Sequence, residues 1–542
     1  MPRSVMSHSF SEVPQVRIPR SSFNRSFGHK TTFDADYLIP LAFDDVVPGD
    51  TFNTDMHFYI RLASPTLYPL MDNLYFESFA FFIPYRLLWD NWEKMHGAQD
   101  NPADSIDFTV PAVDASTTAN MTSGGAGSVQ QLSDYFGLPH VSSFDLSECS
   151  ALPFRAYNLT WNEWFRDQNL QDSVTVNTGN GPDTWSSDYA LLKRGKRHDY
   201  FTSCLPWPQK GDAVQVPLGT TAPIMGLGID ASSPPWSAGP QSVQEAGTAA
   251  STSYSSYMDV SVANRMFVEE DPNITDSPNI FADLSQATGA TINDWRLAFQ
   301  TQRLLERDAR SGTRYNELIL AHFGVTVPDF RVQRPEFLGG GSTPLTLTPV
   351  AQTTYQGTGT LLDAKGALSS IGTISGRHGC TKSFVEHGIV LWLGNVRADI
   401  TYSQGLERYW SKDTRLDFYY PVMSQIGEQA VLNKEIYYQN TAADEEVFGY
   451  QERYGEMRYK NSMLTGLMRP DNAASLDPWH LSEEFGSLPT LGSTFIESNT
   501  GAPLDRGIAV PSQPQFIGDF FFEHRCARPM PLFGVPGNLD RF

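Results

Sequence analysis

Cysteine is scarce in this sequence of 542 residues: the four cysteines, Cys149, Cys204, Cys380 and Cys526, lie far apart. Their spacing excludes a disulfide framework and a paired-cysteine zinc site, and it suits a reducing compartment. Long apolar runs are also missing, because stretches such as GIVLWLG and FAFFIPY are much shorter than the roughly 20 residues that cross a bilayer. The opening MPRSVMSHSF lacks the apolar core of a secretory signal. We therefore expect a protein that folds in a cytoplasm.

Charged residues are few, at 18% of the chain, compared with roughly 25% in an average soluble protein. Aromatic residues reach 12%, and aromatics are enriched at buried contacts between subunits. Few charges and many aromatics in a large chain indicate that other subunits cover much of its surface.

Motifs for catalysis and nucleotide binding are absent: there is no GxxxxGK[ST], HExxH or GxSxG, and no GxGxxG after a strand. Glu386 and His387 place an acid beside a base, but neighbouring strand residues point to opposite faces. The acidic clusters at 100–107, 269–271 and 444–446 offer oxygen ligands, yet none has the spacing of an EF-hand calcium loop. We interpret them as solvated loop acids. We expect no enzyme and no cofactor, with structural calcium as an open alternative.

Charge is unevenly distributed along the chain. The formal net charge is −22, yet residues 1–30 contain five bases and one acid, whereas 209–290 contain nine acids and two bases. Cations neutralise phosphates and aromatic rings stack on unpaired bases. The N-terminal segment is therefore a candidate contact for single-stranded nucleic acid, through Arg17, Arg20, Phe23, Arg25, Phe27 and Lys30. The alternative is that its aromatics anchor the segment on a neighbouring subunit.

Two further basic patches are candidates for the same contact. They consist of Lys193, Arg194, Lys196 and Arg197, and of Arg525 and Arg528 near the C-terminus. A solvated loop is the alternative interpretation of each patch.

The N-terminal and C-terminal parts have the patterns of β-strands. The runs MHFYIRLA, NLYFESFAFFIPY, KSFVEHGIVLWLGNVRADITY and RLDFYYPVM are rich in aromatic and β-branched residues. Between them, 209–290 is dominated by Gly, Ser, Thr, Ala and Pro, and a loop of that length is functional or unstructured. Residues 291–324 then predict two helices, which begin at a capping box formed by Thr291 and Asp294 and end at Gly324.

Several long segments resemble the major capsid protein of microviruses, which are small icosahedral phages with circular single-stranded DNA. The segments are FNRSFGHKTTFDADYLIPLAFDDVVPGDTF, LPFRAYNLTWNEWFRDQNLQ, KRHDYFTSCLPWPQKG, EHGIVLWLGNVRADITYSQGLERYWSKDTRLDFYYP, YQERYGEMRYKNSMLTGLMRP and PMPLFGVPGNLDRF. They are most similar to the gokushovirus branch. The resemblance extends to the C-terminus and is interrupted mainly at 209–290 and 338–372.

This resemblance implies a mainly β fold, an eight-stranded jelly-roll barrel of the viral capsid type with long insertions between strands, some of them helical. It implies self-assembly into a closed T=1 shell around circular single-stranded DNA. The expected domains are an interior-facing basic arm at 1–30, the first part of the body at 31–208, and a variable surface insertion at the three-fold axes at 209–290. A helical pair at 291–325 and the rest of the body and tail at 326–542 follow.

The resemblance also implies partners. These are other copies of the chain, packaged single-stranded DNA, a small basic DNA-packaging protein, a minor (pilot) virion protein and a host-surface receptor. The basic protein is needed because a subunit with a net charge of −22 cannot neutralise a genome. We expect the protein in the virion, assembled in the bacterial cytoplasm, with Trp236, Tyr254 and Tyr257 of the insertion as candidate receptor contacts. A carbohydrate-binding or carbohydrate-active jelly-roll protein is the alternative.

Overall fold

The computed structural model of the chain describes both its N-terminal and its C-terminal parts. The described residues are 19–114, 130–139, 146–215, 224–225, 227–229, 266–268, 281–282, 291–353, 366, 368–470, 472 and 474–533. The chain divides into two units, Gln209–Asp308 and the larger remainder, Met1–Pro208 with Ala309–Phe542. Gln209 is also the residue at which the insertion was predicted to start. None of the described helices is long and apolar enough to span a membrane.

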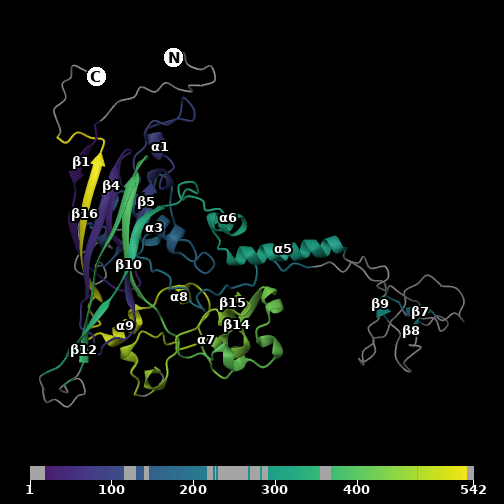
Figure 1. Ribbon diagram of the computed structural model, residues 1–542. Coiled ribbons are helices and arrows are strands. Elements are labelled where there is room, and N and C mark those ends of the chain that lie inside the picture. Colours follow the sequence, from purple (N-terminus) through teal and green to yellow (C-terminus); the bar gives the residue numbers. More distant parts are fainter. Residues whose placement is uncertain are drawn as a thin grey trace, which may run out of the picture. The chain divides into compact units, whose positions relative to one another are not determined.

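The larger unit contains a six-stranded antiparallel sheet, whose long strands lie side by side in Figure 1. Its order is β1 (Ser21–Asn24), β16 (Phe516–Arg528), β4 (Thr51–Leu62), β12 (Leu368–Ser383) and β11 (Thr346–Ala351), and β2 (Phe27–Phe33) also pairs with β16. Buried residues alternate with more exposed ones along β4. This period of two is the pattern of a sheet with one face on the core, and the strand predicted from MHFYIRLA is confirmed.

A four-stranded antiparallel sheet is the second layer. Its order is β10 (Glu336–Pro344), β5 (Leu74–Pro84), β13 (Gly388–Ala398) and β3 (Ile39–Val46). β13 is buried at nearly every position, because both faces of this central strand are covered. The strand predicted from NLYFESFAFFIPY is confirmed as β5. Glu386 and His387, by contrast, lie in the turn between β12 and β13 and not within a strand.

The main core lies between these two sheets. Phe58 of β4, Phe76 of β5 and Phe520 of β16 are each at most 4% exposed. The ring centroids of Phe58 and Phe76 are 4.8 Å apart, and those of Phe76 and Phe520 are 5.8 Å apart. Burial of each such ring stabilises the fold by about 1.5–3 kcal/mol. The sheets of the described residues do not join into a closed barrel.

A second core involves α3 (Leu152–Thr160), whose buried residues pack with residues of β5 and β13. Arg155 of α3 and Asp183 form an ion pair in this region, with both side chains 0% exposed. Two guanidinium nitrogens donate to the two carboxylate oxygens at 2.7 Å each. Arg155 also donates to the carbonyl oxygens of Leu88 and Gly179 at 3.0 and 2.9 Å, so the buried charge is hydrogen-bonded on several sides.

A third cluster of buried residues lies around a two-stranded sheet, β14 (Glu428–Leu432) and β15 (Val447–Glu452). It combines Tyr200, Phe201, Cys204, Val431, Ile436, Phe448 and Phe495. The short helices of this part of the chain are α7 (Asn433–Ile436), α8 (Ser493–Ile496) and α9 (Gly501–Gly507).

The strand predicted from RLDFYYPVM is wrong. These residues form two 3-10 turns, η8 (Arg415–Asp417) and η9 (Pro421–Gln425). The backbone N–H and the hydroxyl of Thr414 both donate to Asp417 Oδ2 at 2.7 Å, which closes the first turn. Pro421 begins the second turn, where its fixed φ suits a helical start. The aromatic residues that indicated a strand are exposed.

The predicted helical pair is confirmed as α5 (Ile292–Arg310) and α6 (Tyr315–Phe323). Thr291 and Asp294 exchange backbone-to-side-chain hydrogen bonds of 2.8 and 3.1 Å, as expected of a capping box. Gly324 ends α6 with φ 68°, a left-handed conformation that favours glycine. In the unit Gln209–Asp308 the described strands also include β6 (Ile224–Met225), β9 (Phe281–Ala282), β7 (Leu227–Ile229) and β8 (Met266–Val268), which pair as β6–β9 and β7–β8.

Candidate functional site

The described part of the predicted basic arm forms strands on β16. Phe23 of β1 is paired with Cys526, and Phe27 of β2 is paired with Phe522. The rings of Phe27 and Phe522 stack with centroids 4.9 Å apart, and Phe23 packs against the main core. These aromatics therefore attach the arm to its own chain. Their stacking on DNA bases stays a prediction, and Arg17 lies outside the described residues.

The cations of the arm contact polar groups near the surface. Arg25 forms an ion pair of 2.5 Å with Asp44, and Lys30 forms one of 2.9 Å with Asp519. Arg20 donates to Thr51 Oγ1 at 2.6 Å. The side chains of Arg25 and Lys30 are 41% and 77% exposed, and exposed ion pairs contribute only about 0–1 kcal/mol. Contact of these cations with phosphate groups stays a prediction.

The two arginines of the C-terminal patch have different surroundings. Arg525 pairs with Glu523 at 2.8 Å, and both side chains are largely exposed. Arg528 pairs at 3.0 Å with Asp50, whose side chain is fully buried. Since Asp50 also accepts from the backbone N–H of Val47 at 3.0 Å, Arg528 stabilises the turn that precedes β4, whereas Arg525 is accessible to a ligand.

The patch at 193–197 is not a solvated loop, so that alternative is wrong. Lys196 forms an ion pair of 2.6 Å with Glu483, with side chains only 2% and 9% exposed. Its ammonium lies 4.2 Å from the centroid of the Phe495 ring. Arg194 lies 4.7 Å from the centroid of the Phe79 ring, and Lys193 lies 5.5 Å from the centroid of the Tyr37 ring. Lys196 is therefore buried, and Lys193 and Arg194 are partly buried against aromatic rings.

Glu77 of β5 is the acidic centre of this region. Its carboxylate contacts three guanidinium groups: Arg194, Arg197 at 3.0 Å, and Arg397 of β13 at 3.1 Å. Burial alone would raise the pKa of Glu77, but the adjacent arginines, Arg194 foremost, lower this pKa to about 2. Burial and the neighbouring charge of Arg397 lower the pKa of Arg194 to about 10.

These cations line one side of a cavity of about 780 Å³ in the larger unit. Its basic lining residues are Arg166, Arg194, Lys196, Arg197, Arg310, Arg314 and Arg397, and its acidic ones are Asp167 and Glu317. Burial, followed by the charge of Arg314, lowers the pKa of Arg166, as expected where cations are close together. Most of these cations already pair with carboxylates, among them Arg310 with Glu428 and Arg314 with Glu317. The sequence did not indicate Arg166, Arg310, Arg314 and Arg397, because they come from segments that are far apart along the chain.

The acids that were considered as calcium ligands mainly cap backbone groups. Asp104 accepts from the backbone N–H of Asn101 at 2.9 Å, and Asp444 accepts from that of Thr441 at 3.0 Å. Within the described residues no group of three or more His, Cys, Asp and Glu side chains could hold a metal ion. The cluster at 269–271 lies outside these residues, and structural calcium stays a prediction. Glu386, which the sequence places beside His387, forms an ion pair of 2.7 Å with Arg86.

The candidate receptor contacts Trp236, Tyr254 and Tyr257 all lie outside the described residues.

The family model and the relatives that match this chain are all described as capsid proteins. The model of the family described as "Capsid protein (F protein)" matches residues 11–538. Capsid protein VP1 of Bdellovibrio phage phiMH2K is 46% identical over 544 residues, which cover 99% of this chain and 98% of the relative. VP1 of Chlamydia phage 1 is 40% identical over 598 residues, covering 98% of both chains. VP1 of Spiroplasma virus 4 is 34% identical over 554 residues, covering 98% of this chain and 97% of the relative.

The resemblance seen in the sequence is thereby confirmed, since these relatives are all proteins of the Microviridae. Capsid proteins are structural proteins of bacteriophage particles and not enzymes. The chain belongs to the capsid (F protein) family of the microviruses.

Proposed function

We propose that this chain builds a T=1 icosahedral shell around circular single-stranded DNA, with a jelly roll as its structural body. Membership of a capsid family implies assembly with copies of itself. The observation that carries the finer proposal is the order in which the strands pair.

The long strands pair in a nested manner. In the six-stranded sheet β2 pairs with β16 and β4 pairs with β12, and in the four-stranded sheet β3 pairs with β13 and β5 pairs with β10. The first of these strands thus pairs with the last, the second with the second to last, and so on inward. A long antiparallel hairpin rolled so that successive pairs alternate between two facing sheets gives a jelly roll. The strand order supports this fold for the body.

A jelly-roll body suits a closed shell for a physical reason. Its core lies between two sheets of one chain, so the subunit is rigid before it meets its neighbours, while long insertions are free to form contacts. Repeated contacts between unlike surfaces produce a finite shell when the symmetry closes. Interfaces of permanent assemblies reach 2,000 Å² and more, in keeping with the low charged fraction of 18%.

We assign DNA contact to the N-terminal strands and to the cavity lined by Arg194, Arg197 and Arg397. The exposed cations Arg25 and Lys30 support the first assignment, and Arg197, whose side chain is 30% exposed, supports the second. A chain with a net charge of −22 cannot neutralise a genome alone, so a small basic DNA-packaging protein is part of the proposal. Host attachment is assigned to the unit Gln209–Asp308, supported by its being a compact unit of its own and by its polar composition.

Sedimentation velocity of the protein expressed in a bacterial cytoplasm, with absorbance read at 260 and 280 nm, tests this proposal. A T=1 shell contains sixty copies of the 60.3 kDa chain, or about 3.6 MDa of protein. A boundary of that size would support the shell, and excess absorbance at 260 nm would report enclosed nucleic acid. A chain that stays monomeric with circular single-stranded DNA and a basic packaging protein present would overturn it.

A further inference from the structure

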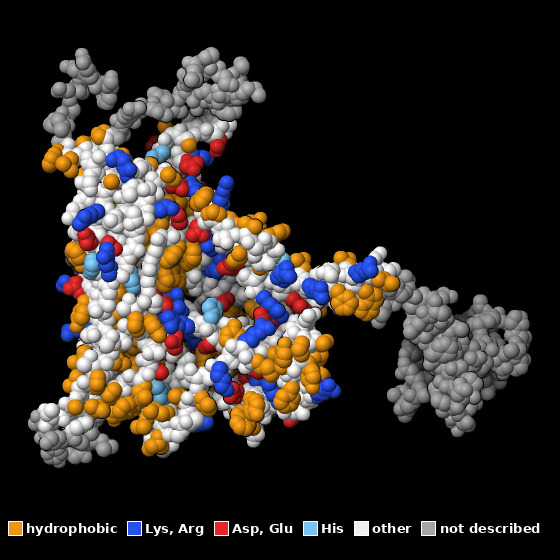
Figure 2. Space-filling model, in the orientation of Figure 1, with side chains coloured by type: hydrophobic (Ala, Val, Ile, Leu, Met, Phe, Trp, Pro, Cys, Tyr) orange, Lys and Arg blue, Asp and Glu red, His pale blue; other side chains and the backbone are white. Residues whose placement is uncertain are grey.

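One surface of the larger unit is unusually rich in exposed apolar side chains. It consists of residues 408–426 and 453–469, called the aromatic surface below. Its exposed large hydrophobic residues are Tyr409, Trp410, Leu416, Phe418, Tyr419, Tyr420, Val422, Ile426, Met457, Tyr459, Met463 and Leu467. Figure 2 shows hydrophobic side chains gathered beside the region that Figure 1 labels β14 and β15. Trp410 is 72% exposed and Val422 is 84% exposed.

The two segments form one surface. Trp410 and Met463 line the same cavity of about 200 Å³, and Glu407, beside the first segment, forms an ion pair with Lys460 of the second. The guanidinium of Arg453 donates to the carbonyl oxygen of Leu416 at 2.9 Å. Apolar residues far apart in the sequence are therefore presented together.

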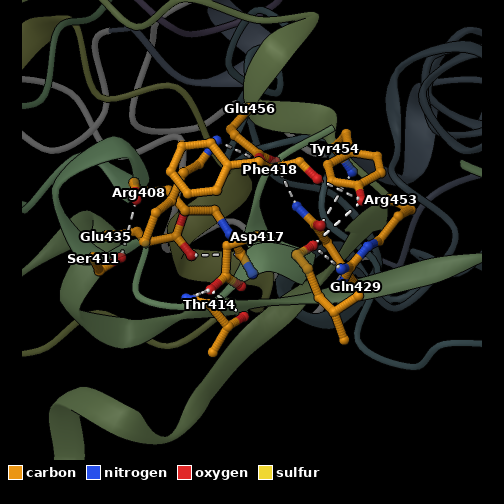
Figure 3. A network of polar contacts seen from close by, with 12 residues as sticks. Arg408, Ser411, Thr414, Asp417, Phe418, Gln429, Glu435, Arg453, Tyr454 and Glu456 are labelled. Carbon is orange, nitrogen blue, oxygen red and sulfur yellow. Dashed lines mark hydrogen bonds and ion pairs between the residues drawn. The ribbon is translucent and has the colours of Figure 1, made fainter. Parts of the chain in front are cut away.

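A polar network beneath the surface fixes its shape (Figure 3). Arg408 donates to Glu435 at 2.9 Å, and the Glu435 side chain is only 3% exposed. Lys412 and Glu456 form an ion pair of 3.5 Å with side chains 7% and 11% exposed. Gln429 donates to Glu456 at 2.7 Å. These groups anchor both segments to the β14–β15 sheet from the inside.

Tyr454 links the network to the surface. The backbone N–H of Tyr454 donates to Gln429 Oε1 at 3.1 Å, and its hydroxyl donates to the carbonyl oxygen of Phe418 at 3.1 Å. This residue is 3% exposed and has φ 61°, a conformation that residues other than glycine seldom adopt. The fold thus holds Tyr454 in an unfavourable conformation at the position that supports Phe418.

A fixed loop with outward-facing aromatic and aliphatic side chains is suited to docking. Binding loses less conformational entropy when the contact surface is already ordered. Tyr, Trp, Phe and Met are also the residues enriched in the cores of protein interfaces. Large exposed apolar patches on a single chain mark interaction sites.

We propose that the aromatic surface is a docking site for a second copy of this chain. The inference rests on the proposed shell function, because it assigns part of the contact between subunits. Family membership supports a second copy as the occupant, because capsid proteins of this family assemble with copies of themselves. The charges of the surface are largely balanced within the chain, as in the pairs of Arg458 with Glu452 and Lys460 with Glu407, so apolar contact is the main attraction.

Single-stranded DNA is the less suitable occupant. Arg408, Lys412 and Arg453 are bonded within the chain, where they hold the loops. The most exposed apolar side chains include Val422 and Met463, which have no ring to stack on a base. A protein partner fits these side chains better.

The test compares matched substitutions. Val422→Glu and Trp410→Glu change the aromatic surface, and Val385→Glu is the control. Val385 is 88% exposed in the turn between β12 and β13, and Val422 is 84% exposed, so neither change disturbs the core. Under conditions in which the wild-type chain assembles, we expect the two surface variants to reduce the assembled fraction about tenfold or more, as for loss of an interface anchor. The control should assemble as the wild type does.

Several outcomes would overturn the inference. One is normal assembly of both surface variants, and another is an equal loss in the Val385→Glu control. A third is weaker binding of a fluorescent single-stranded oligonucleotide with assembly unchanged, which would assign the surface to nucleic acid. Failure of the wild-type chain to assemble at all would instead count against the proposed shell.

Two further measurements keep a negative result interpretable. Circular dichroism and thermal unfolding of the unassembled variants establish that they fold. Hydroxyl-radical footprinting of the wild type compares the oxidation of Trp410 and Met463 in free subunits and in particles. We expect at least a severalfold lower oxidation rate in the particle, and equal rates would overturn the docking site.

Discussion

Phe520 and Phe521 are neighbours in β16 and lie on opposite faces of the strand: Phe520 is 0% exposed and Phe521 is 50% exposed. The first packs on Phe76 across the core, with ring centroids 5.8 Å apart. Both residues are phenylalanines, and they differ only in the face of the strand on which the side chain lies. They are therefore a matched pair for measuring what the core between the sheets contributes.

Phe520→Ala should lower the free energy of unfolding by about 3–5 kcal/mol, because it leaves a cavity between the two sheets. Phe521→Ala should lower it by less than about 1 kcal/mol, as is usual for an exposed position. Urea unfolding of unassembled subunits, followed by tryptophan fluorescence, measures both values. Equal effects of the two substitutions would contradict the assignment of the core to the space between the sheets.

The buried pair of Arg155 and Asp183 gives a second prediction. Arg155→Met leaves the Asp183 carboxylate buried with no cationic partner, so we expect a loss of about 3–5 kcal/mol in the free energy of unfolding. Arg525→Ala is the control, since its pair with Glu523 is exposed and contributes at most about 1 kcal/mol. The same urea titrations apply. An effect of Arg155→Met no larger than that of the control would contradict the assignment of this pair as a buried stabilising contact.

Local patterns account for the parts of the fold that could be predicted. Strand β4 shows the period of two that a sheet requires, and the helical pair begins and ends at capping residues that act on their immediate neighbours. The segment at 415–423 misled because its exposed aromatic residues have the same composition as a buried strand. The turns are instead favoured by the hydrogen bonds of Thr414 with Asp417 and by Pro421 at the start of the second turn.

The cavity could not be predicted in the same way. Arg397 of β13 meets Glu77 of β5 because the two strands are neighbours in a sheet, and Arg197 reaches the same carboxylate from outside the sheet. The sequence does not specify which strands pair. The basic run at 193–197 was visible as a candidate nucleic-acid contact, with a solvated loop as the alternative. The sequence did not reveal its acidic partners, Glu77 and Glu483, because they lie far away along the chain. The family, by contrast, was evident from long shared segments.

The arm's contact with DNA can be tested through salt dependence. Arg25→Ala combined with Lys30→Ala removes two exposed cations, and each phosphate contact on a single strand contributes about 0.7 to the slope of log K against log salt. We expect the slope to fall by up to about 1.4, with the free energy of unfolding changed by less than about 1 kcal/mol. Fluorescence anisotropy with a labelled oligonucleotide measures the slope. Arg528→Ala is the converse control. It should lower the free energy of unfolding by destabilising the turn at Asp50, and it should leave the salt dependence of DNA binding unchanged.

An unchanged slope in the arm variant would remove the DNA contact from this part of the arm. Particle yield and enclosed DNA, compared between the variant and the wild type, give an independent readout. Reduced DNA content with normal shells is the expected result.

Stability of the body should depend on pH through Glu77. The pKa of this carboxyl is lowered from the ordinary 4.5 to about 2 by its three arginines. A group whose pKa is lower in the folded state stabilises folding above its unfolded pKa, and that stability is lost as the pH falls toward the folded pKa. The contribution of Glu77 should therefore be complete at pH 6 and decline between about pH 5 and pH 2. From the size of the shift it is on the order of 3 kcal/mol.

Glu77→Gln is the variant that isolates this effect. At pH 6–7 the variant should be less stable than the wild type, and the difference should shrink as the pH falls below 5, because protonation removes the same charge from the wild type. Urea unfolding at a series of pH values measures both curves. A stability difference that stays constant from pH 7 to pH 3 would show that Glu77 acts through packing alone and that its charge does not hold Arg194, Arg197 and Arg397 together.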